Sequence, residues 1–196
     1  MGKKKIITIV CIIIIILVIG VYFAVDYFLD KDLEKQEQEL QETIDEYGTV
    51  NEENVVTLVA KFNTEVMDNG LEYPASDDYF TVENDVYWYA LYEDIYLYIE
   101  PLQYSGDTEK DIVDMTAINF PKDSENQDMA LQFAKHLIKA NNNELTDTEI
   151  DELIEEAKKA SKDKKVANNG KGITVALAEN ETTYEYQIVR LYAETE

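Results

Sequence analysis

Residues 86–99 read VYWYALYEDIYLYI, and this stretch decides the fold that the sequence predicts. Tyrosine, tryptophan, valine and isoleucine fit the pleated surface of a β-strand, and successive side chains of a strand point to opposite faces of the sheet. Glu93-Asp94 predicts a turn that divides the stretch into two strands, and Pro101 predicts the end of the second strand. The sequence therefore predicts a hairpin with large apolar or aromatic side chains on both faces.

Segments with helical periodicity flank this hairpin. Apolar residues recur at intervals of three and four within residues 53–68 and again within residues 130–138, which indicates two helices that each bury one face. Thr146 and Glu149 form a capping box at the start of a third helix. Strand-forming residues predict three further strands, at residues 111–120, 172–178 and 182–192.

The order of these elements predicts the fold class. One helix is followed by three strands, two helices and two strands. Runs of strands separated by runs of helices are typical of α+β folds, in which an antiparallel sheet packs against helices. We therefore expect an α+β domain over residues 49–196, with a mostly antiparallel sheet packed against helices.

An uncharged apolar run, IITIVCIIIIILVIGVYFAV, occupies residues 6–25. A helix of this length spans roughly the 30 Å hydrocarbon core of a bilayer. Lys3, Lys4 and Lys5 precede the run, which favours a cytoplasmic tail at residues 1–5 and a single-pass transmembrane helix at residues 6–25. The alternative is a cleaved signal peptide, although the run is longer than the usual apolar region and no A-x-A-like site follows it. The sequence therefore predicts a cell-membrane protein whose C-terminal domain lies outside the cytoplasm.

Residues 26–48 connect this run to the predicted domain. They are rich in Glu, Gln and Asp, with apolar residues spaced thinly along a narrow helical stripe. This pattern predicts a membrane-proximal helical stalk. The segment holds too few heptads to establish a coiled coil, so a weak homodimer through the stalk stays an open alternative.

The chain of 196 residues has 41 acidic and 17 basic residues, which gives a net charge of −24. Such a surface repels nucleic acid and anionic lipid headgroups, and it attracts cations or basic protein surfaces. One Cys and one His exclude a disulfide framework and a cluster of His or Cys metal ligands. No G-x-S-x-G elbow supplies a nucleophile for His136, the only histidine. We therefore predict no catalytic residue, no metal site and no cofactor.

Tyrosine is the most unusual feature of the predicted domain, because eight of the 14 tyrosines fall within residues 73–104. Tyrosine is amphipathic and loses little entropy on binding, so exposed clusters often mark recognition surfaces. We expect a pair on each strand to face outward and bind a partner: Tyr87 and Tyr89, then Tyr96 and Tyr98. The alternative is that these tyrosines belong to the core.

These observations favour an extracytoplasmic domain that binds another protein or a surface component, with a shallow surface lined by tyrosine. One alternative is an envelope hydrolase that uses carboxylates alone. Such an enzyme would need a deep polar cleft that holds two or more acids with raised pKa. A third possibility is a structural subunit of a membrane assembly, in which the anchor and the stalk pack against neighbours.

Overall fold

The described part of the chain forms three helices and seven strands, in the order one helix, four strands, two helices and three strands. The computed structural model describes residues 48–72, 75–76, 80–163, 167–168 and 171–192. The predicted cytoplasmic tail and transmembrane helix, and the predicted stalk as far as residue 47, lie outside these residues. Within the described residues, no helix combines the length and the apolar character that a membrane crossing requires.

Helix α2 (Val55–Asp68) begins after Asn54, whose side-chain Oδ1 accepts a hydrogen bond of 2.9 Å from the backbone N–H of Thr57. Its buried residues lie three or four positions apart, as the periodicity predicts: Val55, Leu58, Phe62 and Val66. The helix is capped by Asn69, and Gly70 then adopts a left-handed φ of 78°. The helix predicted over residues 53–68 is therefore confirmed, with its start two residues later.

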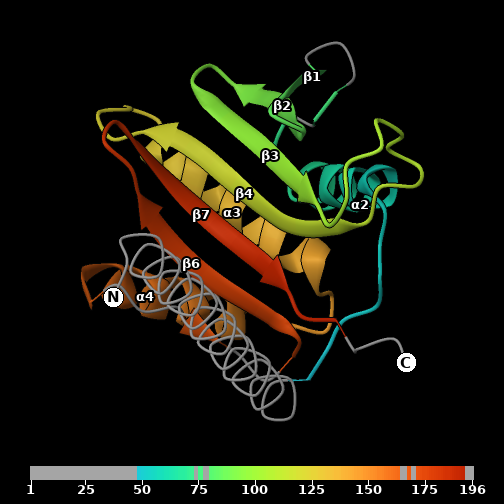
Figure 1. The fold of residues 1–196 in the computed structure, drawn as a ribbon. Coiled ribbons are helices and arrows are strands. Elements are labelled where there is room, and N and C mark those ends of the chain that lie inside the picture. Colours follow the sequence, from blue (N-terminus) through green and yellow to red (C-terminus); the bar gives the residue numbers. More distant parts are fainter. Residues whose placement is uncertain (1–47, 73–74, 77–79, 164–166, 169–170, 193–196) are drawn as a thin grey trace, which may run out of the picture. The chain divides into compact units, whose positions relative to one another are not determined.

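Seven antiparallel strands form one sheet (Figure 1). In chain order they are β1 (Phe80–Glu83), β2 (Val86–Tyr92), β3 (Ile95–Pro101), β4 (Val113–Pro121), β5 (Ala167–Asn168), β6 (Ile173–Glu179) and β7 (Thr183–Arg190). Their order across the sheet is β1-β2-β3-β4-β7-β6-β5. The first four strands therefore form one meander and the last three form another, and the two meanders join where β4 pairs with β7.

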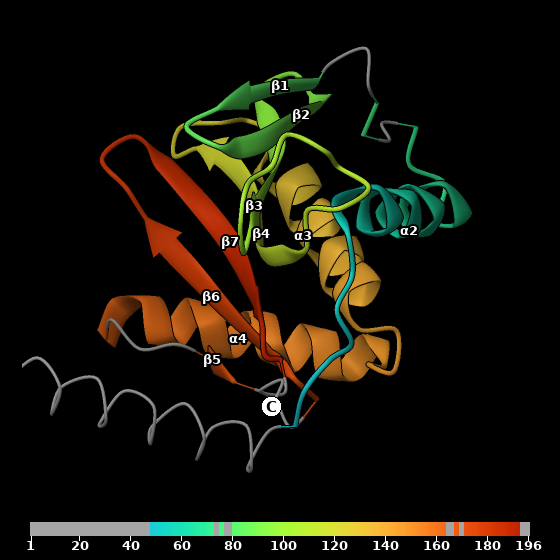
Figure 2. The ribbon, with the colours of Figure 1, turned by 45° about the vertical axis from the view of Figure 1, so that its right-hand side comes forward.

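Helices α3 (Gln127–Asn141) and α4 (Asp147–Asp163) connect the two meanders and cover one face of the sheet (Figure 1 and Figure 2). Helix α3 packs on β4 and β7, and α4 packs on β6. Helix α2 packs on α3, where the rings of Phe62 and Phe133 lie 6.2 Å apart. The predicted α+β class is confirmed.

The capping box predicted at the start of α4 is also confirmed. The backbone N–H of Thr146 donates to Glu149 Oε2 at 2.7 Å, and the backbone N–H of Glu149 donates to Thr146 Oγ1 at 3.4 Å. Each residue therefore satisfies a backbone donor of the other, which is the reciprocal arrangement that defines the motif.

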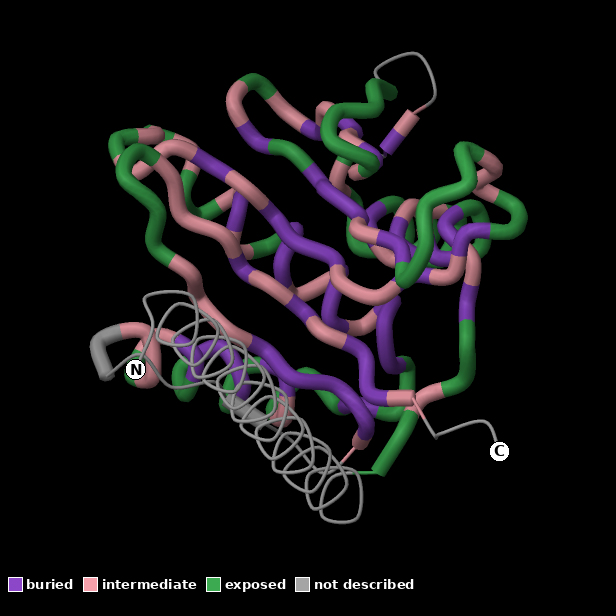
Figure 3. The backbone as a smooth tube through the Cα atoms, viewed as in Figure 1, coloured by how far each residue is buried: buried purple, intermediate pink, exposed green. Residues whose placement is uncertain are grey.

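Burial alternates along β2, and Figure 3 shows that buried residues also occur along the neighbouring strands. One side of β2 and β3 carries residues such as Leu91, Leu97 and Ile99, which join the helices in one hydrophobic core. Over the other side, no helix of the described part is seen (Figure 1 and Figure 2). The sheet therefore has a helix-covered face and a second face, called the open face below.

The sequence does not predict two of the strands. β1 forms a hairpin with β2 through Asn84 and Asp85, which adopt left-handed φ angles of 53° and 63°. Two consecutive left-handed residues make the tight turn of a two-residue hairpin, and Asn and Asp tolerate this conformation better than most residues. β5 is two residues long and lies at the other edge of the sheet, in a segment that sequence reasoning assigns to a loop. The prediction of three strands before α3 is therefore corrected to four.

Candidate binding surface and polar cavity

An aromatic cluster lies on the open face, formed by Trp88 of β2 and by Tyr96 and Tyr98 of β3. The strand register places Trp88 opposite Tyr98, so their side chains point to the same side of the sheet. Their rings stack at 5.2 Å and 26°, and the rings of Trp88 and Tyr96 meet edge-on at 6.4 Å. The Tyr98 hydroxyl lies 3.7 Å from Met115 Sδ on β4. These contacts hold the three rings together as one apolar surface.

The rings of the aromatic cluster differ in exposure. Tyr96 is 39% exposed, whereas Tyr98 is 8% exposed and Trp88 is half-buried. Burial raises the pKa of the Tyr98 hydroxyl, and the carboxylates of Glu185 and Glu100 raise it further. The phenol therefore stays neutral at physiological pH and keeps its proton. Tyr96 is the member of the cluster that is most accessible to a partner.

The open face is acidic around this cluster. Glu100 and Glu185 are close enough to Tyr98 to disfavour its ionisation, and Asn119 donates to Glu185 at 2.8 Å. Arg190 is the only basic residue in the strands of the described part, and its guanidinium lies on the helix side, against Asn141 of α3. A basic partner would therefore meet carboxylates around an apolar centre, with no basic side chain of the strands to repel it.

Tyr87 and Tyr89 lie on the helix-covered face and are only 1% and 3% exposed. The expectation that this pair faces outward is therefore wrong. β1 contributes to the burial, because the ring of Phe80 lies 5.7 Å from that of Tyr87 and 5.1 Å from that of Tyr89. Tyr104, in the loop after β3, lies 5.5 Å from Tyr87. The pair expected on the second strand, Tyr96 and Tyr98, does lie on the open face, but only Tyr96 is exposed, because Tyr98 is 8% exposed. A role in binding for any of the four tyrosines stays a prediction.

Asp111 connects the loop after β3 to the helix-covered face through hydrogen bonds. Its carboxylate accepts hydrogen bonds from the hydroxyls of Tyr87 and Ser105 and from the backbone N–H groups of Ser105 and Gly106. Burial acts to raise the pKa of Asp111, but these hydrogen bonds outweigh burial and lower it. A fully engaged carboxylate with a lowered pKa is a poor general base. Asp111 is therefore a structural residue.

A cavity of about 340 Å³ lies beside His136, between residues of α2, α3 and α4. Burial lowers the pKa of His136, while Glu65 and Asp147 oppose this effect. Lys135 and Asp151 form an ion pair of 2.5 Å in the cavity wall. No serine, threonine or cysteine of the described residues lines the cavity. Among the described residues, His136 therefore has no hydroxyl or thiol beside it in this cavity to activate.

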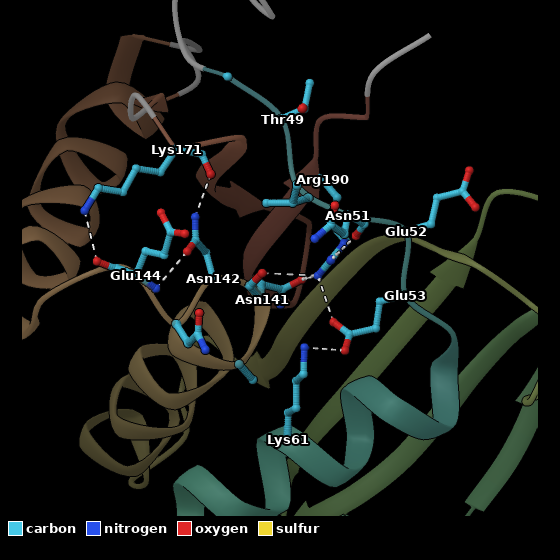
Figure 4. A pocket seen from close by; sticks show the side chains of 14 residues that line it. Thr49, Asn51, Glu52, Glu53, Lys61, Asn141, Asn142, Glu144, Lys171 and Arg190 are labelled. Atoms are coloured by element: carbon cyan, nitrogen blue, oxygen red, sulfur yellow. Dashed lines mark hydrogen bonds and ion pairs between the residues drawn. The ribbon is translucent and has the colours of Figure 1, made fainter. Parts of the chain in front are cut away.

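A second cavity, of about 350 Å³, is called the polar cavity below (Figure 4). It lies between residues 48–53, the end of α3, Lys171 and Arg190. The described part buries seven polar or charged residues, and four of them line this cavity: Glu53, Asn141, Asn142 and Arg190. Burial of polar groups is unfavourable unless they are hydrogen-bonded. Their concentration at one cavity marks a candidate ligand site.

Arg190 is the only arginine of the chain, and its guanidinium connects the walls of the polar cavity. One terminal nitrogen, Nη1, donates to Asn141 Oδ1 at 3.0 Å and lies 3.5 Å from Glu53 Oε2. The other, Nη2, donates to the Asn51 carbonyl at 2.9 Å. Lys61 Nζ pairs with Glu53 Oε1 at 2.5 Å. The sequence analysis does not predict this site. The only feature of the sequence that points to it is that the chain has a single arginine.

Comparison with protein-family models, with curated proteins and with solved structures finds no match for this chain. Among the residues that the structure describes, no three His, Cys, Asp or Glu side chains are grouped so that they could hold a metal ion. The two features from which a function can be inferred are therefore the aromatic cluster on the open face and the polar cavity at the end of α3.

Proposed function

We propose that this chain is a membrane-anchored extracytoplasmic binding module that docks a basic protein on the open face of its sheet. The observation that carries the proposal is the aromatic cluster, in which Tyr96 is 39% exposed and contacts Trp88. Buried or clustered aromatic residues are frequent binding anchors, and the carboxylates of Glu100 and Glu185 suit a partner with Lys or Arg around an apolar residue. The anchor rests on the predicted transmembrane helix at residues 6–25, which lies outside the described residues.

The alternative, a carboxylate-dependent hydrolase, has less support. Such an enzyme needs one carboxylic acid that donates a proton and a second carboxylate that attacks or activates water. In the polar cavity, Glu53 is paired with Lys61 through one oxygen and with Arg190 through the other. Burial raises the pKa of Asp114, but Asp114 does not line the polar cavity. Binding is therefore better supported than hydrolysis.

Site-specific photocrosslinking in native membranes tests the docking surface. A photoreactive amino acid replaces Tyr96 in one variant and Met67, which is 64% exposed on α2, in a matched control. We expect light-dependent capture of one discrete basic protein from position 96 and not from position 67. Added salt and Glu185→Gln should both weaken this capture, because they reduce the attraction between opposite charges. Equal capture from the two positions, or none from position 96, would contradict the proposal.

Accessibility to protease tests the location separately. If residues 1–5 are cytoplasmic, protease added to intact cells should digest the domain that follows residue 25. Protection in intact cells, with cleavage only after lysis, would show that the domain faces the cytoplasm. That result would refute the proposed orientation without bearing on which face of the sheet binds a partner.

A further inference from the structure

The polar cavity is held in shape by backbone contacts. The N–H of Val50 donates to the Leu191 carbonyl at 2.8 Å, which fixes residues 48–53 beside the end of β7. A Cβ on Gly172 would lie 2.3 Å from the carbonyl carbon of Thr49, and the φ of 76° at Gly172 also favours glycine. This segment of the wall therefore has one close-packed arrangement. The cavity is preformed, as small-molecule sites usually are.

Two buried atoms in the wall of the polar cavity have no hydrogen-bond partner among the described residues: Arg190 Nε and Glu53 Oε2. The separation of 3.5 Å between Glu53 Oε2 and Arg190 Nη1 is an ion pair that is too long for a good hydrogen bond. Buried polar groups are nearly always hydrogen-bonded, so each exception needs an explanation. Both atoms are covered, so they are not themselves ligand contacts, but they show that this wall holds more polar groups than its own hydrogen bonds satisfy.

The charges around the polar cavity balance, although the whole chain has a net charge of −24. Three acidic residues and three basic residues line it: Glu52, Glu53, Glu144, Lys61, Lys171 and Arg190. A balanced lining favours neither a polyanion nor a polycation, and it suits a molecule with one charge of each sign. No aromatic ring of the described residues lines the cavity, so it offers no stacking surface for the apolar face of a sugar.

We propose that the polar cavity binds a small zwitterion of the class of free α-amino acids and dipeptides. The ligand carboxylate pairs with Lys61 and Arg190, and the ligand ammonium pairs with Glu53. The volume of about 350 Å³ accommodates a molecule of this size. Glu53 Oε2 and Arg190 Nε are covered, so the ligand meets Glu53 through Oε1 and Arg190 through its terminal nitrogens. This activity is separate from docking on the open face.

Isothermal titration calorimetry of the full-length protein in detergent tests the proposal, with the standard free α-amino acids and glycylglycine as probes. We expect at least one probe to bind with one-to-one stoichiometry. Its N-acetylated and carboxamide derivatives, which each lack one charge, should bind at least about tenfold more weakly. The absence of binding by every probe, or equal binding of the derivatives, would overturn the proposal.

Paired variants locate the bound ligand. Glu53→Gln and Lys61→Met each remove one charge from the polar cavity and should weaken binding at least about tenfold. Glu179→Gln and Lys122→Met are matched controls that should bind normally, because these residues form an ion pair of 2.6 Å outside the cavity lining. If Glu53→Gln fails to fold, Lys61→Met still provides the test, because the Lys61 side chain is 52% exposed. Undiminished binding by Lys61→Met would place the ligand elsewhere and refute the site.

Discussion

Tyr87 and Tyr96 lie on neighbouring strands of one hairpin, yet the first is 1% exposed and the second 39% exposed. Tyr87 points to the helix-covered face, where its hydroxyl donates to the buried Asp111. Tyr96 points to the open face, where its ring contacts Trp88. Because the residue type is the same, the difference arises from what packs against each side chain, since even on the open face Tyr98 is only 8% exposed. A tyrosine in a strand can therefore be a core residue or an accessible anchor, and the packing of the other elements decides which.

The largest effect on stability should come from the helix-covered face. Tyr87→Ala removes a buried ring, and we expect it to lower the free energy of unfolding by about 3–5 kcal/mol. Tyr87→Phe keeps the ring and loses only the hydrogen bond to Asp111, which should cost about 1 kcal/mol. Urea denaturation monitored by the fluorescence of Trp88, the only tryptophan, measures both values. If Tyr87→Ala cost no more than Tyr96→Ala, the assignment of the two faces would be wrong.

A smaller effect on stability, which depends on pH, should come from Asp111, the hydrogen-bond acceptor of Tyr87. The pKa of Asp111 is lowered in the folded protein, so its ionised form favours folding. This contribution is fully present above the unfolded pKa of about 3.9 and is lost as the pH falls through the folded pKa. Asp111→Asn should lower the free energy of unfolding by about 1–3 kcal/mol at neutral pH. As the pH falls, the stability of this variant should decrease less steeply than that of the wild-type protein. Thermal melts over a pH series test this, and equal acid sensitivity of the two proteins would contradict it.

The elements that sequence patterns predict correctly depend on local features. The periodicity of α2 and the capping box of Thr146 and Glu149 are complete within a few residues, and the structure confirms both. β1 is only four residues long, too short for its alternation to identify a strand, and it is held by pairing with β2 and by the Asn84-Asp85 turn. Alternation also indicates which tyrosines share a face. It does not indicate which face the helices cover, since that depends on contacts between distant segments.

The polar cavity escapes prediction for the same reason. Arg190 and Asn51 are 139 residues apart in the sequence, and Arg190 and Asn141 are 49 apart. Glu53 precedes α2 and reads in the sequence as an ordinary acidic residue at the start of a helix. These groups meet only when β7 pairs with β4 and brings Arg190 to the end of α3. No local motif can therefore report the site.

An intermediate effect should come from the cap of α4, on the helix-covered side of the sheet. Thr146→Ala should lower the free energy of unfolding by about 0.5–2 kcal/mol through loss of the N-cap. Thr146→Ser keeps the hydroxyl and is the matched control. The backbone N–H of Thr146, the ammonium of Lys171 and the Thr146 hydroxyl lower the pKa of Glu149 to about 2. The contribution of Glu149 is therefore present above its unfolded pKa and is lost as the pH falls towards 2.

Urea denaturation at neutral pH and at acid pH measures the effect of the cap. The difference between Thr146→Ala and the wild-type protein should shrink in acid, where protonation of Glu149 disrupts the capping box in both proteins. Equal destabilisation by Thr146→Ala and Thr146→Ser would show that the hydroxyl does not stabilise the start of α4.

The smallest change in stability should come from Tyr96 on the open face, although its effect on binding should be large. The ring is 39% exposed and contacts Trp88 edge-on, so Tyr96→Ala should change the free energy of unfolding by no more than about 1 kcal/mol. Truncation of a true binding anchor costs about 2 kcal/mol or more, so the affinity for the captured partner should fall more than about tenfold.

Tyr89→Ala gives the opposite control for this prediction, because Tyr89 is 3% exposed on the helix-covered face. It should destabilise the fold and reduce capture only in proportion to the loss of folded protein. Melting temperature and crosslinking yield, measured on the same preparations, separate the two effects. If Tyr96→Ala unfolds the domain, Tyr96 belongs to the core and the open face is not a docking surface. If Tyr96→Ala changes neither stability nor capture, the partner binds at another place on the protein.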